Sequence, residues 1–154
     1  MRRHPALRQL SSEHHTGLVL ARQARQAATG SAEEQRRAWE VLVARFEAEL
    51  EPHFRCEEEG LLVAMRRSGE TSLVERTLAE HADLRALVAQ NRGVSLARFA
   101  QLLTAHIRFE EQILFERAQE LLDLDRLGGC QPLTGSFQRS AGRIQVPGWG
   151  RCSP

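Results

Sequence analysis

The chain has 154 residues, enough for one domain with a sizeable core and too few for two. Its formal net charge is +1 and it has no long run of like charge, so neither nucleic acid nor a membrane surface is an expected partner. No apolar stretch is long enough to cross a bilayer, and none follows Arg2 and Arg3 as in a secretory signal. We therefore expect a soluble, cytoplasmic protein.

The cysteines support the same compartment. Cys56, Cys130 and Cys152 are odd in number and lack CxxC spacing. This pattern predicts neither a disulfide framework nor a thiolate zinc site, and it fits a reducing environment.

The first two predicted helices are separated by a turn at Gly30. Ser31 and Glu34 then form the pattern of a capping box, which predicts a second helix that runs to about Arg67. Pro52 lies inside this helix and removes one backbone donor, so we expect a kink or bulge beside it. The apolar stripe of the first helix consists of Leu7, Leu10, Leu18, Ala21, Ala24 and Ala28, and that of the second of Val43, Phe46, Leu50, Leu61 and Met65.

Two further helices are predicted by similar signals. Gly69 ends the second helix, and Ser72 with Glu75 is expected to cap a third. Ser95 is expected to cap a fourth, which the glycine pair at 128–129 terminates. The apolar stripe of the third helix consists of Leu73, Thr77, Leu78, Leu84, Leu87 and Val88, and that of the fourth of Leu102, Leu103, Ile113, Leu114 and Leu121.

Four helices with short connections predict an all-α fold, an antiparallel up-down four-helix bundle. Strand-like alternation is absent from the sequence. We expect the bundle to occupy residues 1–129. Residues 130–154 are rich in Gly, Pro, Ser and Arg and are expected to form a C-terminal tail without helix.

The second and fourth predicted helices each carry an HxxxE motif followed by a second glutamate. The segments 53–58 and 106–111 share His, Arg and both Glu at matched positions. The first and third helices each carry a Glu-His pair, at 13–14 and 80–81. The chain is therefore interpreted as two helical hairpins, each with one lone histidine and one HxxxE motif.

The spacing of the HxxxE motif favours metal binding, because residues four apart lie on one face of a helix. Glu57 and Glu110 lie about 40° from the histidine of their motif, near the centre of the apolar stripe. Glu58 and Glu111 lie about 140° away and should sit at the edge of the bundle or in water. Two buried carboxylates would be costly alone, and a pair of cations removes that cost. Mixed imidazole and carboxylate ligation suits iron, zinc and other first-row metals.

These residues resemble the hemerythrin-like family, or HHE cation-binding domain, whose pattern runs His, HxxxE, His, then HxxxE or HxxxxD along four helices. The resemblance covers roughly residues 5–125. It implies two iron ions, bridged by oxide or hydroxide, with Glu57 and Glu110 as bridging carboxylates. The ligands that the resemblance implies are His14, His53, Glu57, His81, His106 and Glu110.

The ligand on the first helix has two candidates. His14 lies on the side of the apolar stripe, which favours it over its neighbour His15. His15, however, has a leucine three residues further on, as His81 does. That spacing would align the second histidine with His81 instead.

Oxygen-carrying hemerythrins have an HxxxH pair on the third helix, but the positions four either side of His81 are Thr77 and Arg85. The resemblance is therefore closer to the di-iron domains of bacterial iron–sulfur repair proteins and of a eukaryotic iron-sensing ubiquitin-ligase subunit. It implies a non-haem di-iron protein that meets O2, NO or peroxide in sensing, detoxification or iron handling. A redox partner or a homo-oligomer is compatible with this function.

Two other functions fit the same sequence. One is a di-iron enzyme that reduces NO or peroxide, as in iron–sulfur cluster repair, because an exchangeable position beside two redox metals permits catalysis. The other is a metal-free helical interaction bundle, in which the repeat has no chemical role. The sequence alone does not separate iron from zinc or manganese.

Overall fold

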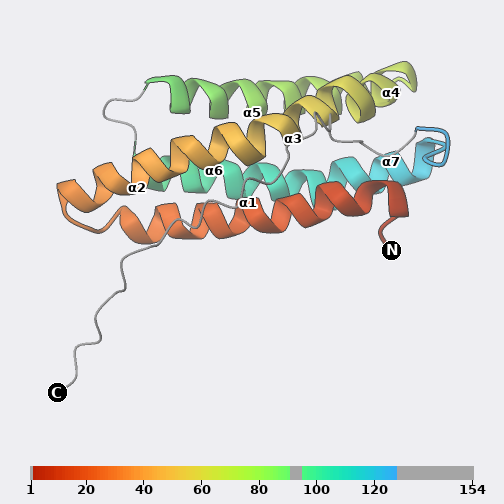
Figure 1. Ribbon diagram of the computed structural model, residues 1–154. Helices are drawn as coiled ribbons and strands as arrows, with labels where there is room; N and C mark the ends of the chain where they lie inside the picture. The colour runs from red at the N-terminus through yellow and green to blue at the C-terminus, as the bar shows by residue number, and fades with distance from the viewer. Residues whose placement is uncertain (1, 91–94, 128–154) are drawn as a thin grey trace, which may run out of the picture.

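The computed structural model describes residues 2–90 and 95–127. Four rods of helix lie side by side, and each runs antiparallel to the one before it in the chain (Figure 1). The first rod is η1 (Pro5–Leu7) and α1 (Arg8–Ala27); the second is α2 (Ala32–Arg45), η2 (Phe46–Leu50), α3 (Glu51–Cys56), η3 (Glu57–Leu61) and α4 (Leu62–Arg67); the third is α5 (Thr71–Gln90); the fourth is α6 (Leu96–Phe109), η4 (Glu110–Leu114) and α7 (Phe115–Leu121).

The described part of the chain contains helices and no strand, which confirms the predicted all-α four-helix bundle. The predicted tail at 130–154 and the glycine pair at 128–129 lie outside the described residues. The proposed boundary between bundle and tail therefore stays a prediction.

Two of the predicted helix starts are capped as expected. Ser31 Oγ accepts a hydrogen bond from the backbone of Glu34, whose carboxylate accepts from the Ser31 N–H at 2.7 Å. Ser95 Oγ likewise accepts from the Arg98 N–H. These bonds satisfy backbone donors that the first turn of a helix leaves free.

The junction between the second and third rods differs slightly from the prediction. Gly69 ends the second rod with φ of +91°, a conformation that favours glycine. The predicted cap at Ser72 is wrong, because α5 already begins at Thr71. The Val74 N–H donates instead to the Glu70 carbonyl, one turn earlier.

Three turns of π-helix interrupt the second and fourth rods. The first, η2, ends two residues before Pro52, whose ring would clash with the carbonyl of Ala48 in a regular α-helix. The wider turn of a π-helix accommodates this residue, so the bulge predicted beside Pro52 is present. The other two, η3 and η4, begin at Glu57 and Glu110 and were not predicted, because no proline marks them.

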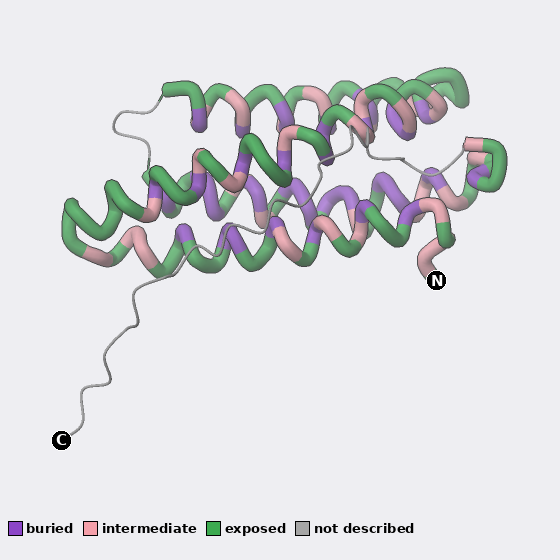
Figure 2. Tube along the Cα trace, viewed as in Figure 1, coloured by how far each residue is buried: buried purple, intermediate pink, exposed green. Residues whose placement is uncertain are grey.

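The buried residues recur along all four rods, on the sides of the rods that face one another (Figure 2). They form two apolar clusters, one towards each end of the bundle. The first cluster includes Leu20, Ala24, Leu42, Phe46, Leu84, Phe99 and Leu103, and the second includes Leu10, Leu61, Met65, Val74, Phe109, Leu114 and Phe115. A layer of buried histidine and glutamate side chains crosses the bundle between the two clusters.

Three residues of the predicted apolar stripes are exposed. Ile113 and Leu121 are 47% and 39% exposed, and Leu18 is 38% exposed. For Ile113 the cause is η4, since the π turn shifts the inward face to the fourth and fifth residues after Glu110. Leu18 lies at the edge of the inward face of α1. His14 and Ala21, which are buried, lie nearer to the centre of that face.

The first and fourth rods come close together at Gly17. A Cβ atom at this position would lie 2.9 Å from Cδ1 of Ile107, so the absence of a side chain permits the approach. His14 and His106 are near neighbours of these two residues in the sequence. The close approach therefore brings both histidines to the same level of the bundle.

Cys56 differs from the expectation drawn from the cysteine count. It packs against the second apolar cluster and is disulfide-bonded. Cys130 and Cys152 lie outside the described residues. The cysteines therefore no longer support a reducing compartment, and the cytoplasmic location stays a prediction.

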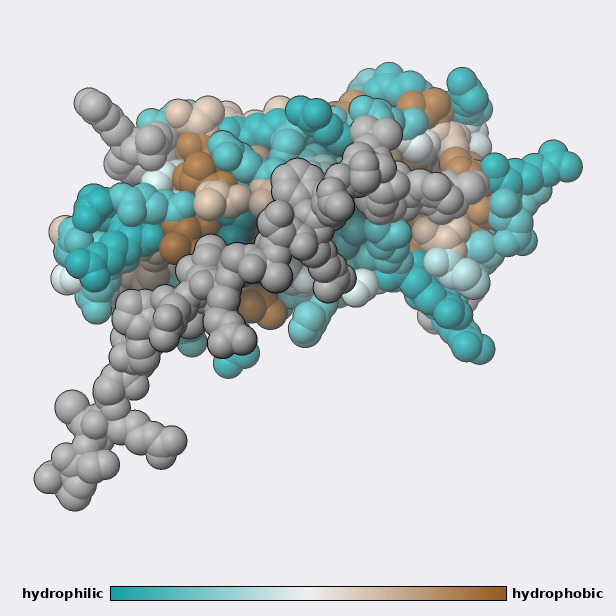
Figure 3. Space-filling model, in the orientation of Figure 1, coloured by the Kyte–Doolittle hydropathy of each residue, from teal (hydrophilic) through white to brown (hydrophobic). Residues whose placement is uncertain are grey.

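Where the face in Figure 3 is coloured, most of it is hydrophilic, with smaller hydrophobic patches between. Among the described helices, none combines the length and the hydropathy that a membrane span requires.

Burial separates two leucines that share one predicted stripe. Leu103 is fully buried in the first cluster, and Leu121 is 39% exposed. We expect Leu103→Ala to lower the free energy of unfolding by about 2–5 kcal/mol, because it removes buried contacts and leaves a cavity. Leu121→Ala is the matched control and should cost less than about 1 kcal/mol. Urea unfolding of the metal-free protein measures both, and equal losses would contradict the assignment.

Candidate metal centre

Six buried polar side chains meet in the layer between the two apolar clusters. Each histidine comes from a different rod, and each glutamate opens a π turn. Every one of the six is at most 3% exposed. The six are His14 on α1, His53 on α3, Glu57 on η3, His81 on α5, His106 on α6 and Glu110 on η4.

The donor atoms fall into two groups that share the glutamates. One group contains His14 and His53 with Glu57 and Glu110, and the other contains His81 and His106 with the same two carboxylates. Within each group one donor atom from each residue lies within 4.8 Å of the others.

Four nitrogen–oxygen distances in the cluster are 3.0–3.4 Å, and two others are 3.7 and 3.9 Å. Nε2 of His14 lies 3.0 Å and Nε2 of His106 3.2 Å from Oε2 of Glu110. Nε2 of His53 lies 3.4 Å from Oε1 of Glu57, and Nε2 of His81 lies 3.4 Å from its Oε2. Two ligands that bind one cation at about 2.1 Å and a right angle would be roughly 3.0 Å apart. The spacing therefore suits donor atoms that share a cation.

The inward-facing atoms of these six residues have no hydrogen-bond partner among the described residues. They are the Nε2 atoms of the four histidines and both carboxylate oxygens of Glu57 and Glu110. Only two other buried side-chain atoms in the described chain share this condition, on Ser11 and Gln119. Buried polar atoms without partners are rare and costly. Their concentration at one point is the property expected of a metal site.

Burial governs the protonation of the centre. It raises the pKa of Glu57 to about 8, with a further contribution from the charge of Glu110, and raises the pKa of Glu110 well above its usual range. It also lowers the pKa of His81 to about 2 and lowers that of His106. The two imidazoles are therefore neutral at pH 7, which is the form that binds metals.

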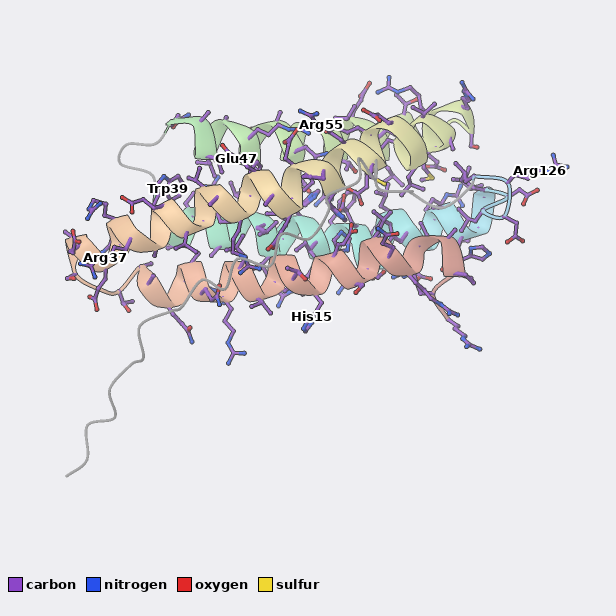
Figure 4. All side chains as sticks on the ribbon, in the orientation of Figure 1. His15, Arg37, Trp39, Glu47, Arg55 and Arg126 are labelled. Atoms are coloured by element: carbon purple, nitrogen blue, oxygen red, sulfur yellow. The ribbon has the colours of Figure 1, made fainter. Side chains whose placement is uncertain are left out.

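The two histidine candidates on α1 lie on different sides of the helix. His14 is buried and its Nε2 atom is part of the cluster. His15 is exposed and points away from the bundle (Figure 4). The structure therefore brings together all six residues singled out in the sequence and leaves His15 outside.

A second set of carboxylates surrounds the centre. Each histidine forms a hydrogen bond through Nδ1 with a half-exposed glutamate of a neighbouring rod, at 2.7–2.9 Å. Because a carboxylate accepts, each Nδ1 donates and each Nε2 keeps its lone pair towards the centre. The four pairs are Glu13 with His53, Glu58 with His81, Glu80 with His106, and Glu111 with His14.

These four hydrogen bonds form a closed ring around the bundle, since each rod supplies a glutamate to the next and the fourth supplies one to the first. Each outer glutamate is a sequence neighbour of an inner residue: Glu13 and Glu80 precede a histidine, whereas Glu58 and Glu111 follow a glutamate. Moving one residue towards the N-terminus on one rod, or one residue towards the C-terminus on an antiparallel rod, rotates the side-chain direction the same way about the bundle axis. Antiparallel packing therefore directs all four carboxylates the same way around.

The outer glutamates are functional candidates that the sequence interpretation missed. Glu58 and Glu111 lie at the edge of the bundle, as predicted, but their carboxylates reach inward to histidines. Although burial would raise the pKa of Glu111, the hydrogen bond with His14 and the charge of Arg3 lower it to about 2. The Glu-His and Glu-Glu neighbours in the sequence were the available signal.

The chain matches the family model described as "Hemerythrin HHE cation binding domain" over residues 5–118. This match covers more than half of the chain, so the protein belongs to the hemerythrin HHE cation-binding family. No curated protein and no solved structure matches the chain.

The burial of Glu57 predicts opposite effects of one substitution with and without metal. In the chelator-treated protein, Glu57→Gln should raise the free energy of unfolding at pH 7 by about 1–3 kcal/mol, because it removes a buried carboxylate that has no partner. In the presence of a bound divalent cation the same variant should be less stable than the unaltered protein.

Thermal unfolding with and without excess cation tests this reversal. Glu59→Gln is the control, because Glu59 is an exposed glutamate of the same π turn. A loss of stability in Glu57→Gln under both conditions would contradict the interpretation.

Proposed function

We propose that the protein is a non-haem di-iron protein whose centre binds a small ligand such as O2, NO or peroxide. The observation that carries the proposal is the set of eight unpartnered buried atoms on six residues of four rods. They offer four imidazole nitrogens and four carboxylate oxygens, a donor set suited to first-row metals. Glu57 and Glu110 would hold both ions, because both donor groups include them.

The number of donors supports a centre that is open to an exogenous ligand. Each group supplies two nitrogens and at most two carboxylate oxygens to its ion. Two histidines with carboxylate oxygen and open positions are typical of non-haem iron sites. Positions remain for a bridging oxide or hydroxide and for one small ligand.

The enclosure of the centre sets the size of that ligand. The six inner residues are at most 3% exposed, and the ring of Phe54 stacks on His81 with centroids 3.9 Å apart. Phe115 stacks on His14 at 5.2 Å. These rings cover His81 and His14, and the outer glutamates bonded to the four histidines are 23–38% exposed. A ligand of two or three atoms suits such a site better than a larger metabolite does.

Iron stoichiometry tests the ligand set. Anaerobic reconstitution with ferrous iron should give about two ions per chain, in line with the two groups of donors. His14→Ala should lose at least one of them, because it removes a buried donor. His15→Ala is the matched control and should retain both, since His15 is exposed. Elemental analysis after desalting decides, and a stoichiometry near zero in the unaltered protein would overturn the proposal.

Exposure to small ligands tests the second part of the proposal. The visible absorption of the reduced, iron-loaded protein should change on adding air, NO or peroxide, because each would occupy an open position on the iron. The zinc-loaded protein is the control and should show no such change, because Zn2+ is redox-inactive. If the iron-loaded protein kept its spectrum with all three ligands, the centre would be a closed metal site.

A further inference from the structure

Three of the four outer glutamates are paired with an arginine. Nη2 of Arg3 lies 2.7 Å from Glu111, Nη1 of Arg85 lies 2.7 Å from Glu58, and Nε of Arg76 lies 2.8 Å from Glu80. Each of these arginines also lies over a phenylalanine ring, with the guanidinium carbon 3.7–5.6 Å from the ring centroid. The three corners of the ring are therefore built alike, from an arginine, a glutamate and a histidine.

The fourth corner, at Glu13, departs from this pattern. Oε2 of Glu13 accepts from His53 and Oε1 accepts from the neutral amide of Gln9 at 3.0 Å. No described arginine forms an ion pair with it, and its side chain is 38% exposed, against 23–29% for the other three. The internal repeat makes the difference plain, because Gln9 stands four residues before Glu13 as Arg76 stands four before Glu80.

The missing arginine changes the donor strength of one histidine. A carboxylate that accepts from Nδ1 raises the electron density at Nε2 and makes the imidazole a stronger ligand. An arginine on the same carboxylate offsets part of its charge and so weakens this effect. Of the four histidines, His53 is therefore the one whose donor strength is raised by an outer carboxylate that no arginine offsets.

We propose that the two metal positions are inequivalent, and that Glu13 is the positioning residue that makes the His14/His53 position bind a divalent cation more tightly than the His81/His106 position. The inference rests on the proposed metal-binding function. Both outer carboxylates of the second position are neutralised by arginine, whereas the first position has one neutralised and one free. The first cation therefore enters beside His53.

Titration of the metal-free protein with Co2+, followed by its visible absorption and by calorimetry, tests the order of binding. The unaltered protein should bind one ion tightly and a second more weakly. Gln9→Arg places a charge where the repeat has Arg76 and should weaken the tight step about tenfold without moving the weak one. His106→Ala should abolish the weak step and keep the tight one, which assigns the two steps to positions.

The converse substitution and a charge control complete the set. Arg76→Gln removes the arginine from Glu80 and should strengthen the weak step towards the tight one. Gln26→Arg adds the same charge as Gln9→Arg to an exposed position of α1 far along the helix from His14, and should change neither step. Gln9, Arg76 and Gln26 are exposed, so all three variants are expected to fold.

Separate results would overturn the two proposals. No binding of Co2+ by the unaltered protein would overturn the metal-binding function and the inference together. Two ions bound with equal affinity would overturn the inequivalence alone. A Gln9→Arg variant with an unchanged tight step, or one that weakens both steps equally, would show that Glu13 is not its cause.

Discussion

The burial of two carboxylates in the middle of the bundle is the constraint on which the rest of the structure depends. Glu57 and Glu110 have no exposed surface, and an apolar cluster closes the bundle on either side of them. An isolated charge there would be strongly destabilising, so the carboxylates require protons or a cation. The arginines near the centre contact the outer glutamates and not the inner ones. Positive charge at the inner carboxylates therefore has to come from outside the chain, and membership of a cation-binding family agrees with this need.

The antiparallel arrangement places an inner set of donors and an outer set of glutamates around the centre, using few residues on each rod. In each rod the inner donor and the outer glutamate are consecutive residues, separated by about 100° around the helix. One residue faces the centre and its neighbour faces the next rod. The same dipeptide that supplies a donor thus orients a histidine on an adjacent helix. This economy explains why the Glu-His and Glu-Glu pairs recur with the HxxxE motifs.

Much of the fold could be predicted from the sequence, because helix caps and apolar spacing are local properties. Ser31 and Ser95 begin helices as their patterns indicate. The spacing of the HxxxE motifs indicated His53, Glu57, His106 and Glu110, and the family resemblance added His14 and His81; all six are buried. The π turns at Glu57 and Glu110 could not be predicted, since no residue type marks them. The turn at Glu110 leaves Ile113 outside the core.

The ring of outer glutamates was out of reach for a different reason. A wheel drawn for one helix places Glu58 and Glu111 at its edge correctly, but says nothing of what the next helix presents there. Their partners depend on how far each rod is shifted along its neighbour. The role of Glu13 can be recognised only by comparing the four outer glutamates. They occupy corresponding positions around the bundle only once it is assembled.

The separation in sequence of the ring's four hydrogen bonds bears on the order of assembly. Three of them join residues 23–40 positions apart, whereas the bond between His14 and Glu111 spans 97. Closing a longer segment of chain costs more conformational entropy, and the last rod is also the last to be synthesised. The centre is therefore completed only when the fourth rod docks against the first. Arg3, which holds both the carboxylate and the carbonyl of Glu111, fastens that final contact. Until then the first three rods offer an incomplete set of donors, so all six inner residues meet only in the finished bundle.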